Sequence, residues 1–582
     1  MTKLWKALGG ALALMATPAL AQSERPNIVV IVADDVGFTD LGAYGGEART
    51  PNIDALAQRG AQFSRYYSSP LCSPSRAMLL TGMDNHRTGH ATIVEVLPPE
   101  LRGRPGYTMR LEPGVVTIAE RLQRSGYRTY ATGKWHLGHG EGDLPNAHGF
   151  DRSFVLDASG ADNWEQRPYI PYYRSADWFE DGEPARLPAD FYSSAFIVDS
   201  MIDYLNADTE RSEPFFAYLA FQAVHIPVQA PREFTANYRG VYDGGWEQLR
   251  ADRWRRAQDL GLLPASAPIG SPHPSLRSWD SLAADEQNLF ARSMEVHAGM
   301  LEAMDHHIGR FIQYLQSRGL AENTIFVVTS DNGPEPSAPA TDADFRRWMS
   351  IVGYSRRVEN LGERGSFVFI GPEWANATAT GALYKFTTGE GGVHVPLIVA
   401  GPGIAQQRID ARAFVTDLAP TLLERAGVAL EAPAMDGVSM NAVLSGGSAT
   451  LRDDAASFGI EVSGHSALYR GDYKLVRTPA PLGDGQWRLY DIAQDPGETT
   501  DLTQQMPELA AAMIAEYGAY AERTGVLDLP PGYDAQRQVV QNTRLMALVN
   551  YWWIYAGMAA LVLIPLGALM WLAVWLVRRR RA

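Results

Sequence analysis

The chain is almost free of cysteine, because Cys72 is the only one among its 582 residues. A single cysteine excludes a framework of disulfide bonds within the chain. Cys72 opens a Cys-Ser-Pro-Ser-Arg run that continues into an apolar helical pattern ending at Gly82. Pro74 suits the first turn of a helix, so we expect Cys72 at a helix N-terminus, where free N–H groups favour negative charge. The alternative interpretation is a small buried apolar residue, the commonest role of a lone cysteine.

Lysine is also scarce, with five lysines against 46 arginines. Apart from two lysines near the N-terminus, only Lys134, Lys385 and Lys474 are present. A lysine kept in an arginine-rich sequence indicates a need for a compact ammonium group. The alternative is a biased amino-acid composition, which explains why lysine is scarce but not where the lysines lie. The net charge is −15, and the only basic block lies at the extreme C-terminus. This balance argues against nucleic acid as a partner.

The two ends of the chain carry apolar segments of different kinds. Residues 1–21 have two lysines, an apolar run and small residues, which predicts a secretory signal peptide cut before Gln22. Residues 545–577 contain no charged residue. This charge-free run is longer than the roughly 20 apolar residues that a transmembrane helix needs. A buried core helix is the alternative, but the arginines at 578–581 favour a membrane anchor with a cytoplasmic tail at 578–582. We therefore expect an exported protein that faces the periplasm and is anchored in the inner membrane.

Between these ends, buried strands alternate with helices, as in α/β proteins. The predicted fold class is α/β, with a large mixed, mainly parallel sheet flanked by helices at residues 22–450. Residues 451–530 predict a smaller antiparallel sheet plus a helix, because 466–477 and 486–492 alternate like a hairpin ahead of a helix at 507–522. Residues 531–544 would link this unit to the membrane. Residues 231–282 show little periodicity and are interpreted as a long excursion that caps a pocket.

Two apolar strands, at 27–32 and 325–329, each end in a pair of oxygen-bearing side chains. Open α/β sheets bind ligands at the carboxyl ends of their strands. One such pair could simply be a solvated turn that caps a helix. Two pairs predict a shared site with the all-oxygen ligands that Ca²⁺ or Mg²⁺ prefers. These side chains are Asp34, Asp35, Asp331 and Asn332.

Cations and histidines occupy similar positions. Lys134 and His136 follow a short strand and would point to the same face of an extended segment, making an anion-binding pair. His225 follows a buried strand, and Lys385 lies in a glycine-rich loop whose glycines would let the backbone approach a ligand. A solvated loop and a packing histidine are the alternatives for these residues.

The Cys72-x-Pro74-x-Arg76 pattern resembles the recognition signature of type I sulfatases, whose cysteine is oxidised to formylglycine. From about Asn27 to Leu502 the chain resembles a bacterial arylsulfatase of the alkaline phosphatase superfamily. The C-terminal anchor departs from the usual soluble pattern of that family. Four further segments match family elements in order: Gly133-Lys134-x-His136, His225-x-Pro227, Ser330-Asp331-Asn332-Gly333 and Lys385-x4-Glu390-Gly391-Gly392.

This resemblance implies an alkaline phosphatase-like fold and a sulfatase mechanism. Formylglycine made from Cys72 by a formylglycine-generating system would hydrate, and one hydroxyl of the diol would attack the sulfate ester. One Ca²⁺ ion, rather than Mg²⁺, would be held by position 72 and by Asp34, Asp35, Asp331 and Asn332. In the roles that the resemblance implies, Arg76 and Lys134 position the diol, Lys385 and His225 bind sulfate and protonate the leaving oxygen, and His136 acts as a base.

The function expected from the sequence is therefore hydrolysis of a small-molecule sulfate monoester to an alcohol or phenol plus sulfate. A phosphonate monoester or phosphodiester hydrolase with the same site is the nearest alternative. A membrane-tethered binding protein without catalysis is an alternative of another class. The natural ester is left open, because the loops expected to surround the pocket are irregular.

Overall fold

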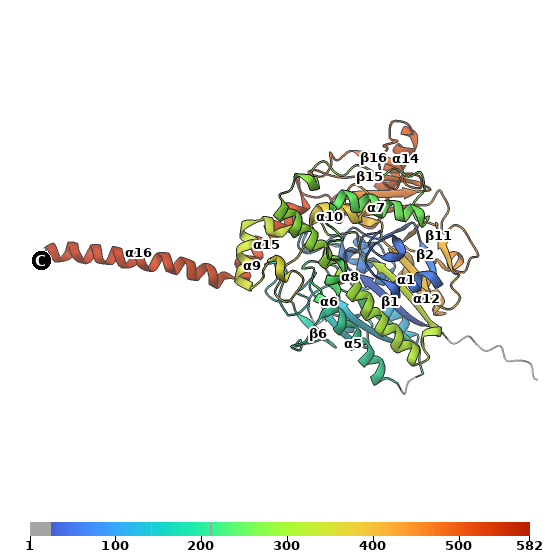
Figure 1. The fold of residues 1–582 in the computed structure, drawn as a ribbon, viewed down its shortest axis with the longest axis horizontal. Coiled ribbons are helices and arrows are strands. Elements are labelled where there is room, and N and C mark those ends of the chain that lie inside the picture. Colours follow the sequence, from blue (N-terminus) through green and yellow to red (C-terminus); the bar gives the residue numbers. More distant parts are fainter. Residues whose placement is uncertain (1–24, 141, 210–211, 582) are drawn as a thin grey trace, which may run out of the picture.

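The computed structural model describes residues 25–140, 142–209 and 212–581. The predicted signal peptide and its cleavage site before Gln22 lie outside the described residues. Figure 1 shows a rounded body from which one long C-terminal helix projects.

Within the described residues, ten strands form a central sheet in the order β11-β2-β10-β9-β1-β8-β4-β5-β6-β7. The strands from β9 to β5 in this order are mutually parallel, while β10, β6 and β7 are antiparallel to their neighbours. The predicted mixed, mainly parallel sheet is confirmed. Its strands are β1 Asn27–Ala33, β2 Ala61–Phe63, β4 Arg128–Lys134, β5 Arg152–Leu156, β6 Trp178–Glu180, β7 Glu183–Pro184, β8 Phe215–Ala220, β9 Thr324–Ser330, β10 Leu397–Ala400 and β11 Gln407–Ile409.

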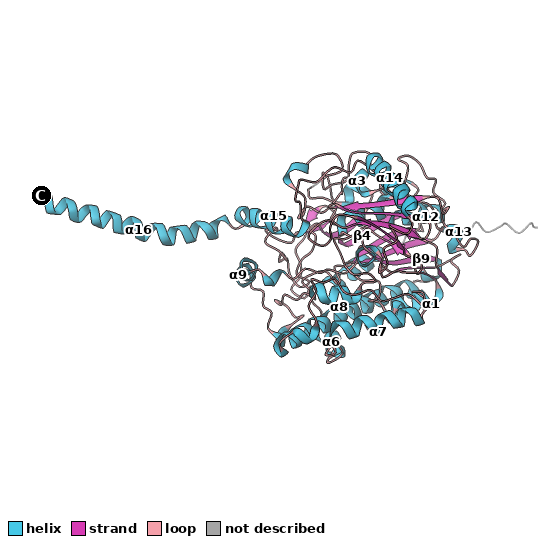
Figure 2. Cartoon of the chain, turned by 90° about the horizontal axis from the view of Figure 1, so that it is seen from above, coloured by secondary structure: helices cyan, strands magenta, loops and turns pink. Residues whose placement is uncertain are grey.

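Strand β1 lies in the middle of the sheet and is buried on both faces. Val29 and Ile31 pack in one hydrophobic core and Ile28, Val30 and Val32 in another, because successive side chains of a strand point to opposite faces. The first core includes side chains of α1, α5, α7 and α8, and the second those of α2, α4 and α12. Figure 2 shows α7 and α8 on one side of the sheet and α12 on the other.

The helices that cover or flank the sheet vary widely in length. Those up to the end of the large sheet are α1 Pro51–Arg59, α2 Cys72–Thr81, α3 Asn85–Thr88, α4 Ile118–Arg124, α5 Ser193–Ala207, α6 Arg232–Thr235, α7 Gly245–Asp259, α8 Ala284–Ser317, α9 Ala343–Val352, α10 Gly371–Thr378 and α11 Glu390–Val393. Later helices are α12 Leu418–Arg425, α13 Asn441–Leu444, α14 Pro507–Thr524, α15 Ala535–Asn550 and α16 Trp552–Arg581.

The interpretation of residues 231–282 as an irregular excursion is wrong in part, because this segment contains α7. The buried face of α7 carries Trp246 and Trp254 together with Arg253, so its apolar periodicity is broken by a charged residue. Arg253 is buried against Asp40 and Glu47, which compensate its charge. A buried arginine of this kind hides a helix from a search for apolar periodicity.

The C-terminal unit is a four-stranded antiparallel sheet covered by a helix, as predicted. The predicted strand at 466–477 is two strands that meet at a turn containing Gly471, and a further strand precedes them. Helix α14 packs Met513 and Tyr517 on one face of this sheet. The strands are β13 Ser457–Val462, β14 His465–Arg470, β15 Tyr473–Arg477 and β16 Trp487–Asp491; β3 Tyr66–Tyr67 and β12 Ala413–Phe414 form a separate pair.

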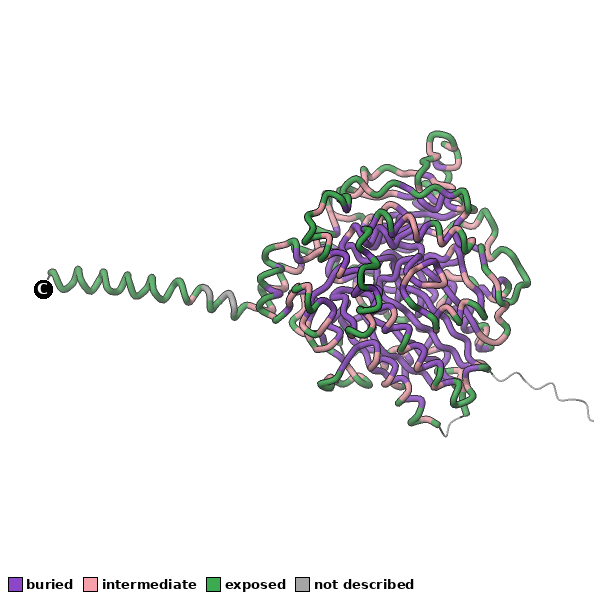
Figure 3. The backbone as a smooth tube through the Cα atoms, in the orientation of Figure 1, coloured by how far each residue is buried: buried purple, intermediate pink, exposed green. Residues whose placement is uncertain are grey.

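The charge-free run at 545–577 is divided between two helices. Helix α15 ends at Asn550 and packs on the body, where Asn542 is buried, and α16 begins at Trp552. Among the described residues, one stretch is apolar and long enough to cross a membrane, Ala559–Arg580 within α16. Figure 3 shows α16 exposed and pointing away from the buried interior of the body.

Candidate functional site

The candidate site lies at the carboxyl ends of four neighbouring parallel strands, β9, β1, β8 and β4. Because parallel strands end at the same edge of a sheet, the residues that follow them meet. Asp34 and Asp35 follow β1, and Asp331 follows β9. Lys134 is the last residue of β4, and His225 lies beyond the end of β8. The strand ends that the sequence indicated therefore converge on one place.

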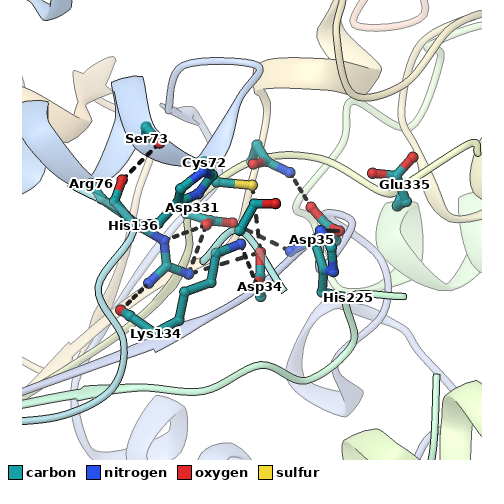
Figure 4. A network of polar contacts seen from close by, with 12 residues as sticks. Asp34, Asp35, Cys72, Ser73, Arg76, Lys134, His136, His225, Asp331 and Glu335 are labelled. Carbon is teal, nitrogen blue, oxygen red and sulfur yellow. Dashed lines mark hydrogen bonds and ion pairs between the residues drawn. The ribbon is translucent and has the colours of Figure 1, made fainter. Parts of the chain in front are cut away.

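Helix α2 brings Cys72 to these strand ends. Cys72 is the first residue of α2 and is only 1% exposed, and its Sγ lies 3.7 Å from Asp34 Oδ1. One helical turn later, the guanidinium of Arg76 donates through Nε to Asp331 Oδ2 at 2.8 Å and through Nη1 to the carbonyl of Lys134 at 2.9 Å. Arg76 thus joins the ends of α2, β9 and β4 (Figure 4).

Two buried lysines neutralise the carboxylates that follow β1. Lys134 Nζ donates to Asp34 Oδ2 at 2.7 Å, and Lys385 Nζ donates to Asp35 Oδ1 at the same distance. Lys385 Nζ also lies 2.8 Å from Glu335 Oε2. Figure 4 shows the carboxylates of Asp34 and Asp35 close to the sulfur of Cys72.

Burial and neighbouring cationic side chains shift the pKa values of this cluster in opposite directions. Burial, with nearby Asp331, raises the pKa of Asp34 to about 8. Burial also acts to raise the pKa of Asp331, but the adjacent Arg76 and Lys134 outweigh it and hold that pKa below its usual range. Burial raises the pKa of the Cys72 thiol well above its ordinary value. An unmodified Cys72 is thus a neutral thiol, and a neutral thiol is a poor nucleophile.

The oxygen-bearing groups fit a metal ion. Asp34, Asp35, Cys72 and Asp331 each offer an atom, and these atoms lie within 4.8 Å of one another. Asp35 Oδ2 and Asn332 Oδ1 are buried and accept no hydrogen bond from the described residues. Buried polar oxygens normally have a partner. Oxygens of this kind, gathered beside further carboxylates, are suitable ligands for a hard divalent cation.

The two histidines reach the site in different ways. His136 was predicted on an extended segment, but β4 ends at Lys134 and His136 has a φ of 55°. The carbonyl of His136 accepts from Ser73 Oγ at 2.7 Å, and neither ring nitrogen has a hydrogen-bond partner among the described residues. Burial, with Lys134 nearby, lowers the pKa of His136 well below its ordinary value. His136 is therefore neutral, and its two ring nitrogens are open to a proton or a ligand.

Within the part of the chain that the structure describes, His225 has a hydrogen-bond partner at one ring nitrogen only. Its Nδ1 lies 2.7 Å from the carbonyl of Ile226, and since a carbonyl only accepts, Nδ1 carries the proton. Its Nε2 lies 3.9 Å from Asp35 Oδ2. Gly160 makes room for the ring, because a Cβ there would lie 2.5 Å from His225 Nδ1.

The glycine-rich loop after Lys385 packs closely against another loop of the chain. A Cβ at Gly333 would lie 2.1 Å from the carbonyl oxygen of Gly391, and one at Gly392 would lie 2.0 Å from that of Thr387. The Gly333 N–H donates to the Gly392 carbonyl at 2.9 Å. These glycines let two loops of the chain pack together, which places Lys385 beside the residues that follow β9.

A cavity of about 80 Å³ borders the cluster. Segments that the sequence did not single out supply much of its wall. Glu335 was missed although it follows Asn332 closely in the chain, while Glu95, Tyr169 and Val539 carry no sequence signal that links them to the site. The lining residues are Cys72, Ile93, Glu95, His136, Ser159, Tyr169, Ile170, His225, Ile226, Glu335, Ser337, Pro339, Lys385, Phe386 and Val539. The 231–282 segment, predicted to cap the pocket, contributes none of these described lining residues.

Comparisons with known proteins agree with this geometry. A model of the sulfatase family matches residues 26–428, and a model described as N-sulphoglucosamine sulphohydrolase, C-terminal, matches residues 383–517. An arylsulfatase of Klebsiella aerogenes is 37% identical over 423 residues, covering 70% of this chain and 88% of that protein. An uncharacterized sulfatase of Schizosaccharomyces pombe is 35% identical over 546 residues, covering 90% and 98%.

Solved structures share the fold at lower identity. The structure of Ps i-CgsB in complex with k-i-k-neocarrahexaose has a TM-score of 0.62 and 23% identity, covering 90% of this chain and 98% of that one. A sulfatase from Pseudoalteromonas sp. has a TM-score of 0.57 and 22% identity, covering 88% and 93%. The family match extends over more than half of the sequence, and the chain therefore belongs to the sulfatase family of hydrolases, within the alkaline phosphatase superfamily.

Proposed function

We propose that this protein is a sulfatase of the arylsulfatase type, which hydrolyses sulfate monoesters to a phenol or alcohol plus sulfate at position 72. The observation that carries the proposal is the buried cluster around Cys72, which gathers three cationic side chains and a set of acidic oxygens and reaches a small cavity through Cys72 and Lys385. Cations in a dry site stabilise the charge that develops on sulfate oxygens far better than they would in water.

We infer that Cys72 acts as formylglycine. The thiol of the unmodified residue is neutral and 1% exposed, so it supplies no thiolate nucleophile. A hydrated aldehyde at this position supplies the nucleophilic hydroxyl and a second hydroxyl from which a proton can be removed. Because Cys72 is enclosed in the folded chain, the formylglycine-generating system must reach it before the chain folds.

The side chains around position 72 have separate roles in this proposal. Arg76 and Lys134 orient the group at position 72, since both are fixed by buried carboxylates. Lys385 lines the cavity and binds a sulfate oxygen. His225 presents Nε2 to the departing oxygen, and it passes a proton there in its doubly protonated form, because Nδ1 already donates to the carbonyl of Ile226. His136 has a neutral, unpartnered ring and accepts a proton from the residue at position 72.

Asp34, Asp35, Asp331 and Asn332 are the residues that would hold a divalent cation, and we propose Ca²⁺ rather than Mg²⁺. The flexible, carboxylate-rich ligand set favours Ca²⁺ over the strict octahedral geometry of Mg²⁺. Such a cation supplies Lewis-acid stabilisation of the anionic nucleophile and substrate. Because these residues lie beside the first residue of α2, a cation that they hold would place its charge next to position 72.

We further propose that the chain is exported and held in the inner membrane by α16. The Ala559–Arg580 stretch is apolar, and arginines follow it at the C-terminus. Extraction of membranes with carbonate checks this: the full chain should stay in the pellet, and a chain that is released into the supernatant would contradict the anchor.

Hydrolysis of paired substrates tests the proposed function. The full-length protein in detergent should cleave an aryl sulfate at a kcat/KM at least about tenfold above that for the matched aryl phosphonate monoester. A chelator should abolish the activity, and added Ca²⁺ should restore it more fully than Mg²⁺. A reversed preference would assign the site to phosphonate monoester or phosphodiester hydrolysis. No hydrolysis by protein that carries formylglycine would favour a binding protein instead.

A further inference from the structure

Helix α15 contacts each of three loops that line the cavity, although it precedes the apolar helix and lies outside both family matches. Side chains of α15 pack directly against the body. Figures 1 and 2 show it against the body, at the point where α16 leaves.

The first of these loops carries Ile93 and Glu95, both of which line the cavity. Asn542, which is 2% exposed, donates through Nδ2 to the carbonyls of Glu95 at 2.9 Å and Leu97 at 3.0 Å. A buried amide that satisfies two backbone carbonyls fixes both segments, because losing it would leave those carbonyls unpaired.

The second and third loops are contacted by less buried side chains of α15. The loop that carries Tyr169 and Ile170 is contacted by Asn550, whose Nδ2 donates to the carbonyl of Tyr172 at 2.8 Å. The segment after Ser337 and Pro339 is contacted by Arg544, whose Nη2 lies 3.6 Å from Asp342 Oδ2. Each contact joins α15 to a loop that supplies cavity wall.

Helix α15 also supplies wall directly, because Val539 lines the cavity that Cys72 lines. Val539 packs in one hydrophobic cluster with Ile93 and Phe386. The cavity is also lined by Ile170 and Ile226 and by the polar side chains of Glu95 and Ser159. An ester bound with its sulfate at Lys385 must place its alcohol part against this wall. Apolar side chains in this wall suit the ring of a phenol better than a polar sugar.

We propose that α15 is part of the leaving-group subsite, and that Val539 is a specificity-determining residue that contacts the alcohol part of a compact, mainly apolar sulfate ester. The proposal rests on the proposed sulfatase reaction and goes beyond it. It places substrate selection on a helix that the family matches do not include.

The test compares two esters of different size, 4-nitrophenyl sulfate and 4-methylumbelliferyl sulfate, with the full-length protein in detergent. The measured quantity is the ratio of their kcat/KM values, because a general loss of stability lowers both values and leaves the ratio unchanged. Val539→Phe should shift the ratio about tenfold toward the smaller ester, and Val539→Ala should shift it toward the larger one.

Val540 is the matched control, since it lies next to Val539 on α15 and is 42% exposed. Val540→Phe and Val540→Ala should keep the wild-type ratio within about twofold. Equal ratios in wild type, Val539→Phe and Val539→Ala would overturn the inference, even if the wild type cleaves both esters. If Val539→Phe does not fold, Val539→Ala and Val539→Leu decide by the same ratio. A wild-type protein that cleaves neither ester overturns the proposed function and this inference with it.

Discussion

The three lysines of the folded body occupy two kinds of buried ionic cluster. Lys134 and Lys385 lie at the candidate site, and Lys474 of β15 lies where the C-terminal sheet meets the glycine-rich loop. Lys474 Nζ lies 2.8 Å from Glu390 Oε1 and 2.9 Å from Glu498 Oε1, and its side chain is fully buried. All three ammonium groups are thus compact cations held by carboxylates inside the protein.

The surroundings of the two clusters differ. The site lysines lie beside a cavity, next to buried oxygens that accept no hydrogen bond among the described residues. Lys474 instead joins two parts of the chain, because Glu390 begins α11 and Glu498 follows the C-terminal sheet. The same residue type therefore lies at the candidate site in one place and joins a subdomain to the body in the other. Both clusters contain buried oxygens without a hydrogen-bond partner among the described residues, so the adjoining cavity, rather than burial of charge, distinguishes the candidate site.

Cys72→Ala should produce the largest effect and mark the site cluster as the reactive one. Removal of the nucleophile is expected to lower kcat for an aryl sulfate by about 10⁵-fold. The thermal unfolding midpoint should change little, since the side chain that is lost is small. Steady-state kinetics and thermal unfolding of the same preparation check both parts. Activity that survives the substitution would place the chemistry elsewhere.

Lys474→Met should affect stability instead of chemistry. Removal of one partner of a buried ion pair is expected to lower the free energy of unfolding by about 3–5 kcal/mol, because buried carboxylates are left uncompensated. The kcat of the molecules that remain folded should stay within about threefold of wild type. Denaturant unfolding and kinetics on the same sample separate the two quantities. A large loss of kcat in fully folded Lys474→Met would remove the distinction between the clusters.

Lys134→Met is the counterpart of that variant within the site. The ammonium of Lys134 is held by Asp34 and would stabilise charge at position 72, so kcat/KM should fall by about 10²-fold. The fall should appear in kcat more than in KM. Equal kinetic losses in Lys134→Met and Lys474→Met would contradict the separate roles.

The smallest expected effect concerns pH and the attachment of the C-terminal sheet. His86 Nε2 lies 2.7 Å from Glu461 Oε2 of β13, and its Nδ1 lies 3.2 Å from Asp84 Oδ1. Although burial opposes protonation, these carboxylates raise the pKa of His86 to about 9 from an ordinary value of 6.5. A histidine with a raised pKa in the folded state stabilises that state fully below pH 6.5, and this contribution disappears as pH rises through 9.

The free energy of unfolding should therefore fall by about 2 kcal/mol more in wild type than in His86→Asn between these pH values. Taking the difference between the two proteins removes contributions from groups they share, such as Asp34. Denaturant unfolding at both pH values measures it. A parallel fall in both proteins would show that His86 does not bind the C-terminal sheet to the body through its charge.

The large sheet and the members of the site were predictable because their signals are local. Strands such as β1 and β9 are unbroken apolar runs that stop at acidic pairs, and parallel pairing brings those pairs together. The scarcity of lysine marked all three buried ammonium groups, but only the fold separates Lys474 from the other two. The roles of the individual site residues remain predictions.

Other features depend on tertiary packing and left no local signal. Arg253 hides the apolar face of α7 because its charge is compensated by residues far away in the sequence. The charge-free run at 545–577 predicted one span, yet its beginning belongs to α15, whose Asn542 bonds to the distant 95–97 loop. Val539 lines the cavity for the same reason, since only the packing of α15 brings it there.

The mass of the peptide from Tyr66 to Arg76, taken from active full-length protein, tests the central claim most directly. If position 72 is the reactive residue, the peptide should carry formylglycine, with a CHO group in place of CH₂SH, and the fraction converted should parallel the specific activity across preparations. Fully active protein in which this peptide contains only unmodified cysteine would contradict the account.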